Sequence, residues 1–128
     1  MTLIATSEIT FDDMFPGNPA GPKIVTVSGD RQNGAHISIV KFPPGSESPL
    51  HTHSNEAEGV VVSGVMSHWH EGETQASAKA LPAGSYFKEP AMLRHVTACA
   101  AGSECVAVII QKSKWDGKPV EQPKTAPR

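Results

Sequence analysis

The stretch from Gly45 to Gly64 reads GSESPLHTHSNEAEGVVVSG and carries the strongest structural signal of this chain. It presents His51 and His53 two positions apart and ends in a run of valines. Side chains two apart in an extended strand point to the same side, so these imidazoles can chelate one metal ion. A valine run is typical of a strand buried on both faces or packed closely inside a barrel. The stretch therefore predicts a metal-binding pair beside the core of a β-domain.

Short β-branched segments on both sides of this stretch predict an all-β chain. They recur every ten or so residues and are separated by turn residues, a pattern typical of a barrel or sandwich. The eleven Gly and eleven Pro of the sequence supply the turns. We expect 24–28 and 35–42 to share one sheet, and 95–99 to pair with 105–111 across a turn. The other expected strands are 59–63, 65–70 and 85–88.

The length predicts one domain, because 128 residues leave no room for a second core. Residues 1–23 crowd proline with glycine, and we interpret them as an irregular N-terminal arm. Residues 116–128 hold three prolines and many charges, which predicts a flexible C-terminal tail. The barrel is assigned to residues 24–115.

Composition excludes several classes of function. With 11 basic and 13 acidic residues and a formal charge of −2, the chain offers no basic surface for nucleic acid. No apolar run has the length of a signal peptide or a membrane span, so we expect a cytoplasmic protein without a membrane partner.

The two cysteines, Cys99 and Cys105, are too few for a disulfide framework. We expect reduced, buried thiols, with a disulfide between them as the alternative.

A third histidine, His95, follows a second segment punctuated by glycine and proline. Three imidazoles suit Fe(II), Zn, Mn, Ni or Cu, and they suit Mg or Ca poorly. The sequence therefore predicts that His51, His53 and His95 bind one divalent transition metal.

The stretch around the first two histidines resembles the cupin family. The first cupin motif is a glycine, five residues, His-x-His, three or four residues, a glutamate, six residues and a glycine. Gly45, His51, His53 and Gly64 match this spacing. The sequence around these residues is most similar to that of small cupins of unassigned function, which are related to the cupin half of ChrR-type anti-sigma factors.

The second cupin motif resembles the segment around His95. The motif is a glycine, five residues, a proline, one residue, a glycine, two residues, a histidine, three residues and an asparagine. Gly84, Pro90 and His95 match, whereas Met92 replaces the second glycine and Cys99 the asparagine. The resemblance implies a single jelly-roll barrel, a small-molecule substrate and a homodimer formed through an edge strand or the N-terminal arm.

The chain departs from the family at the glutamate ligand. Counting back from Gly64 places Ala57 at that position, between Glu56 and Glu58. Glu58 keeps the required gap from His53 and could reach the metal through a β-bulge. In a regular strand both glutamates face away from the histidines. Either one remains a candidate ligand or catalytic base, but the default is a three-histidine site, which resembles the Fe(II) sites of acetylacetone dioxygenase and other cupin dioxygenases.

Other polar residues near the motifs have simpler interpretations. We expect His68 and His70 to be exposed on either side of a core-facing Trp69, with a place in the pocket or a fourth ligand as the alternative. Lys88 and Glu89 are expected to face solvent.

Together these features predict a small-molecule metalloenzyme, with an Fe(II)-dependent dioxygenase favoured. One alternative is a non-redox isomerase, lyase or hydrolase with Zn, Mn or Ni, which gains if Glu56 or Glu58 serves as a base. Another is a metal- or ligand-sensing module without catalysis.

Overall fold

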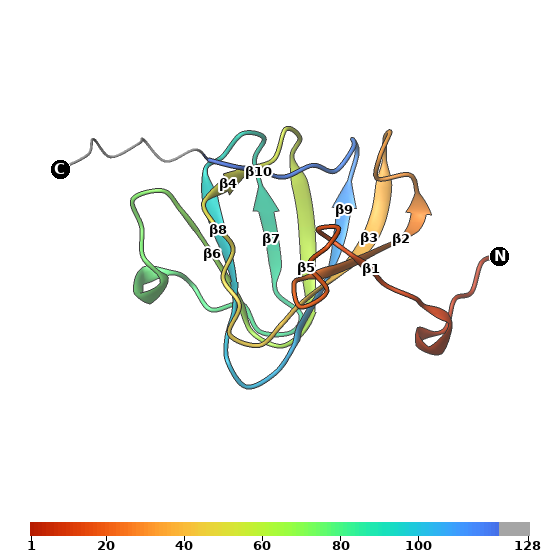
Figure 1. Cartoon of the computed structure of the whole chain (residues 1–128), viewed down its shortest axis with the longest axis horizontal. Helices are drawn as coiled ribbons and strands as arrows, with labels where there is room; N and C mark the ends of the chain where they lie inside the picture. The colour runs from red at the N-terminus through yellow and green to blue at the C-terminus, as the bar shows by residue number, and fades with distance from the viewer. Residues whose placement is uncertain (121–128) are drawn as a thin grey trace.

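The computed structural model describes residues 1–120 and arranges them as ten strands and two single turns of 3-10 helix (Figure 1). The helical turns are η1 (Thr6–Glu8) and η2 (Gln75–Ser77). The strands are β1 (Asp12–Asp13), β2 (Lys23–Gly29), β3 (His36–Phe42), β4 (His51–Thr52), β5 (Ala57–Ser63), β6 (Met66–His70), β7 (Tyr86–Glu89), β8 (His95–Cys99), β9 (Cys105–Gln111) and β10 (Lys118–Pro119).

The strands form two antiparallel sheets, which confirms the predicted all-β, jelly-roll type of fold. The larger sheet has the order β1-β2-β3-β9-β5-β7, and the smaller sheet has the order β10-β4-β8-β6. The expected pairing of 24–28 with 35–42 is present as β2 and β3. Within residues 1–120, no helix is long and apolar enough to cross a membrane.

The main core lies between the two sheets, because alternate residues of the strands point inward. In β5, Ala57, Gly59 and Val61 are buried, whereas Val62 is 52% exposed. The valine run is therefore buried on one face only. The core combines residues of both sheets: Ile24, Val40, Ala57, Val61, Met66, Phe87, Cys99, Cys105, Ala107 and Ile109.

The predicted hairpin between 95–99 and 105–111 is wrong. β8 lies in the smaller sheet between β4 and β6, whereas β9 lies in the larger sheet between β3 and β5. The short turn between them crosses from one sheet to the other, and a disulfide joins Cys99 to Cys105 with their Cα atoms 5.8 Å apart. The expectation of reduced thiols is corrected, because the crossing brings the last residue of β8 against the first residue of β9.

Removing this disulfide is expected to lower stability. A Cys99→Ala/Cys105→Ala variant should lose roughly 2 kcal/mol of unfolding free energy, the amount expected when so short a loop is no longer closed in the unfolded chain. Urea unfolding measures the change, and wild-type protein in a reducing agent should show a similar loss. A midpoint that does not respond to reductant would contradict the prediction.

The structure attaches parts of both chain ends to the barrel. β1 pairs with β2 in the segment interpreted as an arm, and β10 pairs with β4 in the segment interpreted as a tail. The remainder of the predicted tail, residues 121–128, lies outside the described residues. Figure 1 shows β10 crossing beside β4 at one end of the barrel.

Candidate metal centre

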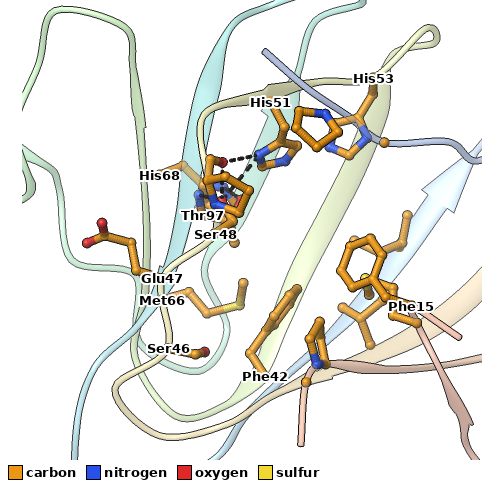
Figure 2. Close-up of a pocket in the computed structure, with 18 of the residues that line it drawn as sticks. Phe15, Phe42, Ser46, Glu47, Ser48, His51, His53, Met66, His68 and Thr97 are labelled. Carbon is orange, nitrogen blue, oxygen red and sulfur yellow. Dashed lines mark hydrogen bonds between the residues drawn. The ribbon is translucent and has the colours of Figure 1, made fainter. Parts of the chain in front are cut away.

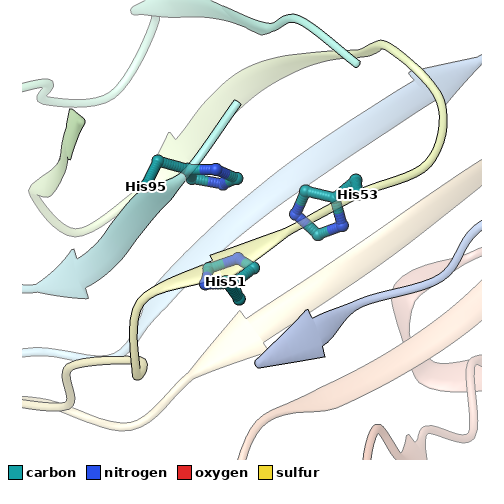
Figure 3. A group of neighbouring side chains, drawn as sticks. All are labelled: His51, His53 and His95. Carbon is teal, nitrogen blue, oxygen red and sulfur yellow. The ribbon is translucent and has the colours of Figure 1, made fainter. Parts of the chain in front are cut away.

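The three predicted ligands lie together at one end of the smaller sheet (Figure 3). His51 of β4 pairs directly with His95 of β8, and His53 follows β4 immediately. The ring centroids of His51 and His95 are 4.3 Å apart, and those of His53 and His95 are 5.1 Å apart. One candidate ligand atom from each ring lies within 4.8 Å of the others. Strand pairing thus brings together residues that are far apart in the sequence.

Each imidazole is oriented through its Nδ1 atom. The Nδ1–H groups of His51 and His95 donate to the carbonyls of Pro49 and Leu93, both at 2.8 Å. His53 donates in the same way to the carbonyl of Asp116. This tautomer leaves Nε2 as the lone-pair donor of each ring, and a backbone acceptor behind the ring is the usual arrangement of metal-bound histidines.

The geometry and charge of the trio fit a divalent transition metal. His95 is 2% exposed, and its Nε2 has no hydrogen-bond partner among the described residues. A buried nitrogen of this kind needs a partner, and a metal ion supplies one. Burial lowers the pKa of His51 to about 4, so its ring is neutral at pH 7 and free to bind metal.

Asp116 holds the loop that carries His53, although it lies in the segment predicted as a tail. Its Oδ1 accepts a hydrogen bond from the backbone N–H of Ser54 at 2.8 Å, and its Oδ2 accepts one from the Ser54 hydroxyl. The Trp115 ring packs on His53 with centroids 4.7 Å apart. Nothing in the sequence signalled this contact, because it joins segments more than 60 positions apart.

The two glutamates proposed as ligands do not reach the histidines. Glu58 lies on the outer face of β5, where it accepts a hydrogen bond from the Tyr86 hydroxyl at 2.8 Å, and Glu56 is exposed. The pairing of β5 with β7 is regular from Ala57 to Val60, so no bulge turns Glu58 inward. The regular-strand argument from the sequence therefore describes their orientation correctly.

Glu89 lies among the histidines, so the expectation that it faces solvent is wrong. Glu89 is 7% exposed, and its Oε2 is 3.3 Å from the Nε2 of His53. Its Oε1 is 3.5 Å from the Nε2 of His95 and 3.1 Å from the Nδ1 of His68. A signal existed: Glu89 is two positions from Phe87, and β7 alternates with Phe87 and Glu89 inward.

Burial and neighbouring charge shift the pKa values of Glu89 and His95 in opposite directions. Burial alone raises the pKa of Glu89, but the neighbouring rings of His68 and His95 hold that pKa well below its usual range. Burial alone lowers the pKa of His95, but the Glu89 carboxylate outweighs it and the pKa is raised. The carboxylate is therefore ionised and makes this end of the cavity attractive to a cation.

His68 also points inward, which corrects its predicted exposure. Trp69 packs on the outer side of the smaller sheet with Val96, Ala98 and Leu50, so its neighbour His68 faces the other way. The side chain of His68 is only 15% exposed, and its ring lies 4.3 Å from that of Phe87. The prediction placed Trp69 in the barrel core and so assigned the inward and outward faces of β6 the wrong way round. The side chain of His70 is 58% exposed, as predicted.

A cavity of about 760 Å³ extends from the histidines into the barrel (Figure 2). His51, His53 and His68 lie at its polar end, and Phe15 of the N-terminal arm lies across the space from them. The rest of the wall is largely apolar and includes Phe42, Met66, Phe87, Ile109 and Trp115. Such a cavity suits a small molecule with an apolar body and one polar, metal-binding end.

Comparison with solved structures shows the same fold. KdgF from Halomonas sp. superposes with a TM-score of 0.66 at 21% identity, over 87% of this chain and 94% of that one. The polyketide cyclase RemF from Streptomyces resistomycificus gives a TM-score of 0.74 at 14% identity, over 97% and 88%. A cupin-like protein from Thermotoga maritima gives 0.62 at 21% identity, over 84% and 90%. At these identities the likeness concerns the fold alone.

The search of curated proteins found no match. A family model described as "Domain of unknown function (DUF4437)" matches residues 11–126, which is most of the chain. The two sheets, the cupin-like neighbours and this match lead to one conclusion: the chain has a cupin-like fold and belongs to the DUF4437 family.

Proposed function

We propose that this cupin is a metalloenzyme, in which His51, His53 and His95 bind one divalent transition metal and the cavity binds a small-molecule substrate. The observation that carries the proposal is the buried Nε2 of His95, which makes no hydrogen bond within residues 1–120, beside two further imidazoles of fixed orientation. A purely structural cluster would satisfy that nitrogen with a protein group. The similar structures include a protein named as a polyketide cyclase, which agrees with an enzyme on this fold.

Fe(II) is the metal that we propose, with a dioxygenase reaction on a chelating substrate such as a diketone or a catechol-like anion. Three imidazoles form a ligand set that suits Fe(II), and a bound Fe(II) would supply O₂ chemistry at such a site. In a dioxygenase both oxygen atoms of O₂ enter the product, so no further reductant is consumed. The apolar wall around Phe42 and Met66 would orient the substrate body and exclude water.

Metal identity and open coordination positions test this proposal. Protein purified without chelators or a metal column should contain close to one iron per chain by ICP-MS. The Fe(II) form should bind nitric oxide, an O₂ surrogate, and give the corresponding high-spin EPR signal, while a Zn-loaded sample should stay silent. Protein that binds no metal would contradict the metalloenzyme, and Fe(II) protein that leaves nitric oxide unbound would contradict the dioxygenase.

His68 favours a second candidate, a non-redox isomerase, lyase or hydrolase that uses Zn, Mn or Ni. Its ring lines the cavity, and its Nε2 is buried without a hydrogen-bond partner among the described residues. Non-redox chemistry at a metal-bound carbonyl needs a group that carries a proton, and an imidazole beside the metal can do so. One zinc, manganese or nickel per chain in place of iron would select this candidate.

Homodimer formation and a cytoplasmic location remain predictions from the sequence.

A further inference from the structure

Ala57, which replaces the family's glutamate, stands directly opposite Glu89. The two residues are register partners in the antiparallel pair β5 and β7, and both side chains point inward. Directly opposite residues project on the same side of a sheet, with Cβ atoms about 5 Å apart. The carboxylate of Glu89 therefore projects from β7 on the same side of the sheet as the methyl group of Ala57.

The distances from Glu89 to the histidines match neighbouring positions around one ion. Metal bonds of about 2.1 Å place adjacent ligand atoms about 3.0 Å apart in an octahedron and about 3.4 Å apart in a tetrahedron. The carboxylate oxygens of Glu89 lie 3.3 Å from the Nε2 of His53 and 3.5 Å from the Nε2 of His95. The Nε2 of His95 makes no hydrogen bond among the described residues, although the Oε1 of Glu89 is near. Two donor atoms so close and unaligned are placed to share a cation.

The carboxylate is also held in place from behind. The Nδ1 of His68 contacts the Oε1 of Glu89 at 3.1 Å, and the hydroxyl of Thr97 lies 3.1 Å from the same nitrogen. Outer partners of this kind orient metal-binding carboxylates in proteins. His68 thus contacts Oε1, which also lies near His95, and the other oxygen, Oε2, lies near His53.

We propose that Glu89 is the fourth ligand of the metal, so that this cupin provides its carboxylate from β7 instead of β5. The inference rests on the metal site of the proposed function. Four protein ligands leave two positions of an octahedron open, and a substrate that binds through two oxygen atoms fills both. With Glu89 bound to the metal, the substrate of the dioxygenase proposed above binds through one oxygen atom rather than as a chelate, and O₂ takes the other open position.

Moving the carboxylate back to the family position gives a sharp test. We would compare wild type, Glu89→Ala, Glu89→Gln and the exchange variant Ala57→Glu/Glu89→Ala, which keeps the charge and total side-chain volume of the pair. Co(II) and Zn(II) affinities are measured by competition with a chromophoric chelator, and the Co(II) absorption bands report coordination. Glu58→Gln is the control, because Glu58 is on the outer face of the same strand.

Glu89→Ala is expected to weaken Co(II) and Zn(II) binding by about 100-fold, at the upper end of losses seen even for outer-shell partners. Glu89→Gln should shift the Co(II) bands and weaken binding less, and the exchange variant should recover most of the affinity. Glu58→Gln should match wild type. Circular dichroism of the metal-free proteins checks folding, and Glu89→Gln, nearly the same shape as the native residue, keeps the test valid if the exchange variant does not fold.

Two outcomes would overturn the inference. If Glu89→Gln and Glu89→Ala keep the affinity within about threefold and leave the Co(II) bands unchanged, Glu89 is not a ligand; one metal per chain in wild type would leave the proposed function standing. If wild type binds no metal, the proposed function and this inference fail together.

Discussion

A His51→Ala/His95→Ala variant is expected to contain no stoichiometric metal when wild type contains close to one ion per chain. The two rings are register partners across β4 and β8, and both present Nε2 to the same space because their Nδ1 atoms are held by backbone carbonyls. Removing both leaves one imidazole of the trio. The loss should exceed the roughly 10–100-fold reduction in affinity that follows removal of an outer-shell partner.

ICP-MS on both proteins, purified side by side without chelators, measures this effect. His70→Ala is the matched control. His70 is the last residue of β6 in the same smaller sheet, but its side chain is exposed and contacts Glu73. It should keep the full metal content. Equal metal in wild type and the double variant would rule out this trio as the binding site.

Gly59→Ala is expected to destabilise the barrel and disturb the cavity wall. A Cβ atom at Gly59 would lie 2.1 Å from the Cζ of Phe87, much closer than real Cβ contacts allow. The Phe87 ring has little room to move, since the ring of His68 packs 4.3 Å from it. Overpacking of this kind costs about 1–3 kcal/mol, and we expect the upper part of that range.

Urea unfolding, followed by circular dichroism, measures the change in stability. Gly34→Ala is the control, because no described residue other than its chain neighbours lies within 4 Å of the Cβ that it would add. That variant should unfold close to wild type. If Gly59→Ala also unfolds at the wild-type midpoint, the close packing of Phe87 against β5 is wrong.

Features that depend on local pattern were predictable from the sequence. Alternation within β5 places Ala57 inward and Glu58 outward, as the regular-strand argument expects. His51 and His53 are two positions apart, so a short extended segment suffices to bring them to one side. The all-β class follows in the same way from short β-branched segments and turn residues, because each depends on neighbouring residues only.

Features that depend on which face of a strand meets the core were not predictable in the same way. Period-two alternation tells which residues share a side but not which side is inward. The prediction for β6 chose Trp69 as the inward residue, and the outer cluster with Val96 and Ala98 reverses that choice and turns His68 into the cavity. The same ambiguity hid Glu89, whose inward direction follows from Phe87 only when Phe87 is known to be buried.

By itself, then, the sequence determined the all-β class, the cupin resemblance and the histidines of the candidate site, because these follow from spacing along the chain. Only the tertiary structure decided that Glu89 stands opposite Ala57, that Asp116 holds the loop of His53 and that Cys99 joins Cys105 across the sheets. The physical reason is common to all three. Each contact depends on how strands pair and how sheets face each other, and that arrangement is set by burial of the whole core.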